Sequence, residues 1–288
     1  MFTKASASRN NFAALTDESP ESEWVMIDFT SSDESSDLLA DMLWSLGVVA
    51  IEERQSTPGH VTLRTSMGEE PHAAITTVRT AFPDVDAQII GVPRSIADSW
   101  RQHATATWVS DTIALVPAWI SAPENATSIF IEPLDTFGLG NHPTTVLALR
   151  LALRHIPNNA HLIDVGCGSG VLAIALSKVK NCSSVVFDIA ESARGAVHAN
   201  AELNGVSNVV WTEHWQSAHA VAVVANILAP VLKAEAMSIE TTLTSGGLIV
   251  LSGMRDDQVT EVLMHYPNSH EIDRESMDGW SAVVLSKN

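Results

Sequence analysis

The sequence predicts an α/β protein in two parts: a small α+β domain, followed by a mostly parallel sheet with helices on both faces. From about residue 126 onward, short and nearly continuous apolar runs alternate with helical patterns, which is typical of strands buried on both faces. In the first third, the patterns instead follow the order strand, helix, strand, strand, helix, strand. These two observations define the predicted fold class.

The first domain is predicted over residues 22–93. It follows a tail at 1–21 that is rich in Ser, Ala, Asn and Thr and that we expect to be disordered. Its strands and helices are predicted, in order, at WVMIDFT, SSDLLADMLWSLG, VVAIEERQ, HVTLRTS, HAAITTVRTAF and DAQIIGV. This order is that of a ferredoxin-like sandwich, a small fold that often serves as a recognition module.

A connector is predicted at 94–120, before a second domain at 121–288. The connector contains Trp100, Trp108 and Trp119, which we expect to pack onto the second domain rather than to stack on a ligand. The predicted strands of the second domain are HLIDVG, SSVVFDI, NVVWTEH, AVAVVANI, GGLIVLSG, HEIDRES and WSAVVLS, with helices between most of them.

The bulk composition narrows the classes of function. The formal charge of −18 opposes binding to nucleic-acid phosphates and suits a basic partner, although acidity that serves only solubility would look the same. The apolar runs fall short of the ~20 residues that span a bilayer, so we expect no membrane association. Two cysteines do not make a disulfide framework, so we expect a protein of the reducing cytoplasm. We also expect a monomer.

A glycine-rich segment lies between a predicted strand and a predicted helix. Gly166, Gly168 and Gly170 follow Asp164, with Cys167 between the first two glycines. Glycines at the carboxyl end of a strand let the backbone approach a ligand closely, and the next helix presents free N–H groups. The G-x-G-x-G spacing differs from the G-x-G-x-x-G of dinucleotide sites and from a phosphate-binding P-loop. A tight turn without a ligand is the alternative explanation.

Polar residues end two further predicted strands. Asp188 closes the strand after the glycine segment, where a carboxylate can accept both hydroxyls of a ribose, and Ile189 beside it is placed to face an adenine. Asn226 closes a later apolar strand and is a candidate site residue. Each polar side chain could instead cap the helix that follows it.

The segment FGLGNHPTT, residues 137–145, concentrates turn residues and hydroxyls before an apolar helix. Asn141 or His142 is expected to cap this helix, and Pro143 suits its first turn. His142 is interpreted as structural, because no second histidine stands at metal-ligand spacing and no metal site is expected.

Five segments in order, FGLGNHPTT, DVGCGSGVLAIAL, ANAELNGV, VVANILAPVL and GGLIVLSGM, resemble the ribosomal protein L11 methyltransferase family. The resemblance covers roughly residues 22–287, and in the first domain it depends on topology. It implies a Rossmann-like class I methyltransferase sheet, S-adenosylmethionine as methyl donor, an amino-terminal substrate-recognition domain, and methylation of amino groups of a ribosomal protein.

The resemblance also implies cofactor contacts at named positions. These are Thr144, Thr145, the glycine loop that starts at Gly166, Asp188 and Asn226. Their positions beside these residues add Asp164, Cys167, Gly168, Gly170 and Ile189 as candidate cofactor contacts, and Phe137, Gly138 and Gly140 belong to a loop expected to fold over the cofactor. Asn226 is the candidate catalytic residue. The chain departs from the family at Leu139 and Asn141, where threonines are usual, and at Ala190, where a second acid is common.

Other functions remain open from the residues. The same chemistry on another protein lysine or a small amine would fit, since Leu139 and Asn141 alter the loop. So would a non-catalytic assembly factor that only holds S-adenosylmethionine. A nicotinamide-dependent oxidoreductase is disfavoured by the glycine spacing.

Overall fold

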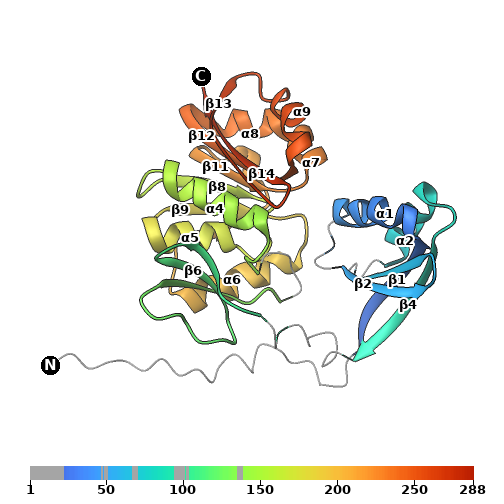
Figure 1. Cartoon of the computed structure of the whole chain (residues 1–288). Coiled ribbons are helices and arrows are strands. Elements are labelled where there is room, and N and C mark those ends of the chain that lie inside the picture. Colours follow the sequence, from blue (N-terminus) through green and yellow to red (C-terminus); the bar gives the residue numbers. More distant parts are fainter. Residues whose placement is uncertain are drawn as a thin grey trace. The chain divides into compact units, whose positions relative to one another are not determined.

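The computed structural model describes residues 23–46, 48, 51–66, 71–93, 101, 104–134 and 139–288. It divides into two compact units, one ending at Ala104 and the other running Thr105–Asn288 (Figure 1). The expected tail at 1–21, the expected anchor Trp100 and the loop residues Phe137 and Gly138 lie outside the described residues.

The first unit is a four-stranded antiparallel sheet with two helices. Its elements are β1 (Glu23–Ser32), α1 (Asp33–Ser45), β2 (Glu52–Thr57), β3 (His60–Thr65), α2 (Pro71–Ala81) and β4 (Asp86–Pro93). The strand order is β2-β3-β1-β4, so the two central strands are the first and third in sequence. This is the expected order of elements. Ile27 and Phe29 of β1 are fully buried with Leu39 and Leu43 of α1 in the core of the unit.

The second unit begins with a small three-stranded sheet. It consists of β5 (Thr107–Ser110), β6 (Ile113–Pro117) and β7 (Thr127–Ile131). The first two strands fall inside the connector predicted at 94–120, and Val109 and Leu115 of these strands are buried in the core of the second unit. Trp108 remains 45% exposed, so it is only partly packed, and its expected role as an anchor stays a prediction.

The main sheet has seven strands in the order β10-β9-β8-β11-β12-β14-β13. The first five are parallel, whereas β14 is antiparallel to both of its neighbours. The elements are α4 (Pro143–His155), β8 (His161–Val165), α5 (Val171–Lys180), β9 (Ser183–Phe187), α6 (Ser192–Asn204), β10 (Val209–Trp211), β11 (Ala220–Asn226), α7 (Ala229–Ala234), α8 (Ala236–Thr242), β12 (Leu243–Arg255), α9 (Val259–Leu263), β13 (Ser269–Met277) and β14 (Trp280–Lys287).

Alternate residues of the central strands enter two separate cores. Leu162 of β8 and Val224 of β11 pack with residues of α4 and α5. Their neighbours Ile163 and Val223 pack with residues of α7, α8 and α9. Helices therefore cover both faces of the sheet, as the continuous apolar strands predict. Among the described residues, no helix combines the length and apolar character needed to cross a membrane.

Candidate functional site at the carboxyl edge of the sheet

The glycine segment is a loop that joins β8 to α5 in an unusual backbone conformation. Gly166, Gly168 and Gly170 have φ angles of 73°, 51° and 79°, which side chains disfavour. The backbone N–H groups of Gly166 and Cys167 donate to the carbonyl of Phe187, at 2.8 and 3.0 Å, which fixes the loop to the end of β9. A Cβ atom at Gly166 would lie 2.1 Å from Cγ2 of Ile227, so that position has no room for a side chain.

Asp188 contacts this loop directly. Its Oδ2 accepts a hydrogen bond from the backbone N–H of Gly168 at 2.8 Å, and its Oδ1 accepts one from Ala190 at 2.9 Å. The carboxylate is held in one orientation by these bonds, and because each carboxylate oxygen has two lone-pair sites, both oxygens keep an acceptor position. Beside it, Ile189 is 96% exposed at the rim.

Asp164 is the most deeply buried charged group of the edge, at 1% exposure. Its Oδ2 accepts from the N–H of Ala173 at 3.2 Å, whereas its Oδ1 has no hydrogen-bond partner among the described residues. Burial, with a smaller contribution from the nearby charge of Asp188, raises the pKa of Asp164 to about 7. A buried acceptor without a donor is costly, so this oxygen suits a ligand that brings one.

The start of α4 lies against the end of β11 at the same edge. Asn226 Nδ2 donates to Thr145 Oγ1 at 3.3 Å. His142 is the helix cap, because its Nδ1 accepts from the N–H of Thr144 at 3.3 Å, and Pro143 occupies the first turn. His142 Nδ1 also lies 2.8 Å from Thr144 Oγ1. Burial lowers the pKa of His142, which favours the neutral imidazole that such a cap requires. Both threonine hydroxyls therefore already have protein partners.

The structure thus brings most of the predicted residues to one edge. The glycine loop, Asp164 and Asp188 meet at β8 and β9, and Thr144, Thr145 and Asn226 meet at β11. Gly140, from the loop expected over the cofactor, lies against β6, where a Cβ atom would be 2.6 Å from Leu115 Cδ1. No cluster of three or more metal-ligand side chains occurs in the described ranges.

A pair of asparagines on α6, for which the sequence predicted no role, holds the end of β7. The Asn200 side chain is fully buried, accepts from the N–H of Glu132 at 2.8 Å and donates to the carbonyls of Glu132 and Ser169 at 2.9 and 3.0 Å. Asn204 makes the same reciprocal pair with Phe130. Two asparagines four residues apart share one helix face, so their spacing in ANAELNG could have indicated that both side chains act on the same neighbouring element.

Ser252 on β12 also received no role from the sequence. Its hydroxyl donates to the carbonyl of Thr144 at 2.9 Å and lies 3.4 Å from that of Ser281. It therefore ties the start of α4 to β12 and β14. Nothing in the residue pattern marks this serine, because the contact depends on how α4 crosses the sheet.

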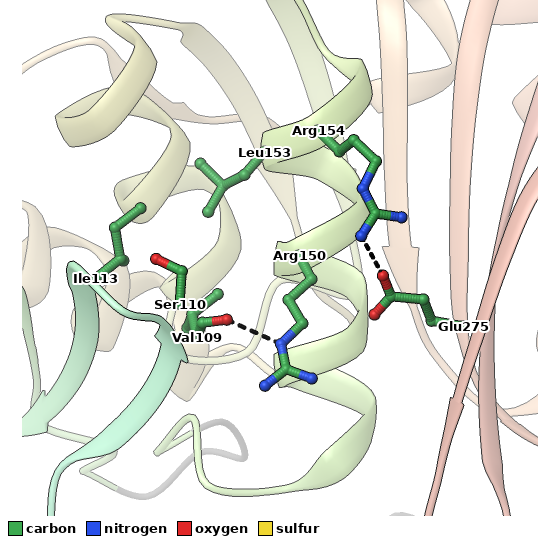
Figure 2. A pocket seen from close by; sticks show the side chains of 7 residues that line it. All are labelled: Val109, Ser110, Ile113, Arg150, Leu153, Arg154 and Glu275. Carbon is green, nitrogen blue, oxygen red and sulfur yellow. Dashed lines mark hydrogen bonds and ion pairs between the residues drawn. The ribbon is translucent and has the colours of Figure 1, made fainter.

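A cavity of about 500 Å³ lies away from these residues, over β5, α4 and β13. Figure 2 shows its lining, including the hydrogen bond of 2.8 Å from Arg150 Nε to the carbonyl of Val109 and the ion pair between Arg154 and Glu275. None of the predicted site residues lines this cavity. The candidate site is therefore identified by the polar groups of the sheet edge rather than by this cavity.

The glycine loop and its two aspartates lie at the carboxyl edge of a mostly parallel sheet, and comparison with known proteins identifies the family. The family model "Ribosomal protein L11 methyltransferase (PrmA)" matches residues 93–288. The chain belongs to this family. The ribosomal protein L11 methyltransferase of Chromobacterium violaceum is 38% identical over 179 residues, which are 61% of this chain. That of Shewanella woodyi is 28% identical over 91% of this chain and 98% of its own length.

A solved structure supports the same family fold. The crystal structure of ribosomal protein L11 methylase from Lactobacillus delbrueckii subsp. bulgaricus superposes with a TM-score of 0.60 at 26% identity, over 64% of this chain and 99% of that one. The predicted class I methyltransferase sheet is confirmed. In the matches to Chromobacterium violaceum and to two Neisseria species, the chain spans only about 60% of the length of the relatives.

Proposed function

We propose that this protein transfers methyl groups from S-adenosylmethionine to amino groups of a basic ribosomal protein, with L11 as the first candidate. One observation supports this proposal most: Asp188, Asp164 and the glycine loop lie together at one edge of a parallel sheet, on strands next to the strand of Asn226. We call this group the nucleoside cradle, because its acceptors and close backbone approach suit a nucleoside. The relatives that carry the L11 methyltransferase name support the choice of acceptor. The net charge of −18 favours encounter with a basic protein in the cytoplasm.

The residues of the cradle fit S-adenosylmethionine. The remaining acceptor positions of Asp188 suit the two hydroxyls of a ribose, and the exposed Ile189 offers an apolar surface to an adenine. The unpaired Oδ1 of Asp164 suits a donor at the amino-acid end of the cofactor. When bound, the cofactor supplies a methyl group on a positively charged sulfur.

Asn226 would orient the acceptor amine. Its amide nitrogen donates to Thr145, which leaves the carbonyl oxygen to accept an N–H bond from the amine. A lysine amine has a pKa near 10.4, so its neutral form costs about 4 to 5 kcal/mol at pH 7. A desolvated pocket and a nearby positive charge both favour the neutral amine. Once the proton has left to water, orientation of the lone pair is the main task of the protein.

Two substitutions separate binding from transfer. Asp188→Ala should weaken binding of S-adenosylhomocysteine at least tenfold in calorimetry, because the ribose acceptors are lost. Asn226→Ala should lower turnover of radiolabelled methyl transfer to free L11 at least tenfold and leave cofactor affinity within about threefold. Asp111→Ala, at an exposed turn between β5 and β6, is the control and should change neither.

The acceptor is tested separately. Free L11, assembled large subunits, other lysine-containing proteins and small amines should be compared as substrates, and the net acidity of the enzyme predicts preference for the free protein. Methyl transfer only to a small amine would overturn the L11 assignment. Cofactor binding without transfer to any acceptor would instead indicate an assembly factor, and binding of NAD in place of S-adenosylhomocysteine would overturn the methyltransferase proposal itself.

A further inference from the structure

The carboxyl edge of the sheet continues beyond Asn226 to an aromatic residue that the proposed mechanism does not use. Asn226 pairs with Ser252 of β12, and three residues further along this strand Arg255 pairs with Trp280, the first residue of β14. Asp188 and the glycine loop lie on the other side of Asn226, at β8 and β9. Trp280 therefore flanks the candidate transfer site on the side opposite the nucleoside cradle.

A cation already occupies the ring of Trp280. The guanidinium carbon of Arg255 lies 5.1 Å from the ring centroid, within the range of a cation–π interaction. Arg255 is exposed, and none of the ion pairs in the described part of the chain involves it. The ring therefore attracts a positive group that no carboxylate holds in place.

His142 is the second neighbour of the Trp280 ring, and it connects this ring to Asn226. The His142 ring lies edge-on to Trp280, with centroids 5.0 Å apart and an interplanar angle of 72°. His142 caps the helix whose Thr145 accepts from Asn226. Because burial favours the neutral form of His142, this neighbour adds no positive charge that would repel a cation. Trp280 and Asn226 are thus held in one framework by the first turn of α4.

We propose that the face of Trp280 is the receptor for the substrate's lysine ammonium group, and that Arg255 occupies this face until the substrate displaces it. The inference rests on the proposed function and deepens it, because it names the group that selects a cationic side chain. An aromatic face attracts ammonium and methylated ammonium alike, since the attraction needs charge and no N–H donor. The receptor can therefore retain an amine that has already gained methyl groups, whereas the hydrogen bond to Asn226 weakens as N–H groups are replaced.

Substitution of Arg255 and substitution of Trp280 should change the affinity for an ammonium ligand in opposite directions. Arg255→Ala removes the resident cation and should tighten binding of an ammonium ligand two- to fivefold. Trp280→Leu removes the π face and should abolish specific binding. Trp280→Phe keeps a ring in the same place and should weaken binding only severalfold, which guards against misfolding of the leucine variant. A role of Trp280 in packing alone predicts no gain in Arg255→Ala.

The binding test needs no methyl transfer. The full chain is labelled with 5-fluorotryptophan, the fluorine resonance of Trp280 is assigned by its loss in Trp280→Phe, and tetramethylammonium chloride is titrated in. tert-Butanol is the neutral control, because 2,2-dimethylpropane, the uncharged isostere of tetramethylammonium, is too insoluble. The expected result is a saturable shift with tetramethylammonium, tighter in Arg255→Ala, and none with tert-butanol. An equal response to both probes, or unchanged affinity in Arg255→Ala, would overturn the proposal.

Kinetics separate this inference from the proposed function. With a lysine peptide as acceptor, Trp280→Phe should raise KM severalfold and Arg255→Ala should lower it, with kcat changed less in both. Transfer with an unaltered KM in both variants would overturn the receptor and leave the methyltransferase intact. Binding of tetramethylammonium by a protein that methylates no acceptor would leave the receptor intact and overturn the proposed function.

Discussion

At the scale of single residues, the site depends on how closely Ile227 approaches two glycines. Ile227 follows Asn226, and its side chain occupies the space that a Cβ atom at Gly166 would need. On its other side, a Cβ atom at Gly253 of β12 would lie 2.4 Å from the carbonyl oxygen of Ile227. The end of β11 thus contacts the glycine loop on one side and β12 on the other because neither glycine has a side chain.

Gly166→Ala should therefore weaken cofactor binding more than the strain of its backbone conformation alone would. The variant combines a positive φ with a steric clash, and we expect cofactor affinity to fall at least tenfold in calorimetry with S-adenosylhomocysteine. Gly205→Ala is the matched control, because Gly205 has a φ of 66° and nothing within 4 Å of the position of a Cβ atom. It should cost about 1 kcal/mol of stability and leave affinity unchanged. Equal effects of the two variants would show that the contact with Ile227 is unimportant.

Asp164 should make stability depend on pH. Its ordinary pKa of 3.8 applies in the unfolded chain, whereas burial raises the pKa to about 7 in the folded protein. Between these values the folded state binds one more proton than the unfolded state, so the free energy of unfolding should fall as pH rises from about 4 to about 7 and then level off. Asp164→Asn removes this contribution.

The measurement is a pair of urea titrations at pH 5 and pH 8 for both proteins. The loss of stability on going to pH 8 should be smaller in Asp164→Asn than in the unsubstituted protein. An identical loss in both would mean that Asp164 titrates at its ordinary pKa despite its burial.

At the scale of elements, α6 acts on β7 as a neighbouring strand would. The side chain of Asn200 exchanges two hydrogen bonds with the backbone of Glu132, and that of Asn204 does the same with Phe130. These two backbone positions are two residues apart, which is also the spacing of hydrogen-bonded pairs along an antiparallel strand. Only Asn200 also donates to the carbonyl of Ser169 in the glycine loop. One side chain therefore joins three elements: α6, the end of β7 and the loop.

Substitution of the two asparagines should separate these roles. Asn200→Ala and Asn204→Ala should each destabilise the protein by about 1 to 3 kcal/mol, because buried backbone groups lose their partners. Hydrogen exchange of the N–H of Glu132 or Phe130 should accelerate accordingly. Only Asn200→Ala should also weaken binding of S-adenosylhomocysteine. If Asn204→Ala weakened it equally, the effect would come from general loosening and not from the bond to Ser169.

At the scale of the whole molecule, each unit has its own core. The core of the first unit lies between its sheet and the helices α1 and α2, and the main sheet of the second is covered on both faces by its own helices. The division falls after Ala104, so the small sheet of β5, β6 and β7 belongs with the second unit. Arg150 of α4 also bonds to β5, which fixes this sheet to the larger one.

A fragment of residues 105–288 should therefore fold without the first unit. Its thermal unfolding, followed by circular dichroism, should be a single cooperative transition, because both cores of the main sheet are complete within it. A fragment that begins at residue 121 is the comparison, since it lacks β5 and β6 and should be markedly less stable. A broad, non-cooperative transition of the 105–288 fragment would contradict the division at Ala104.

The sequence by itself determined the order of strands and helices, the glycine loop and the strand-end positions of Asp188 and Asn226, because these follow from local periodicity and from residues adjacent in the chain. The tertiary structure decided which distant residues meet. Asn200 and Glu132 are 68 residues apart, and Ile227 meets Gly166 because β8 and β11 are neighbours in the sheet. Trp280 reaches His142 because β14 enters antiparallel beside β12. Such contacts depend on strand order and on the crossing of α4, and the local periodicity of a single sequence encodes neither.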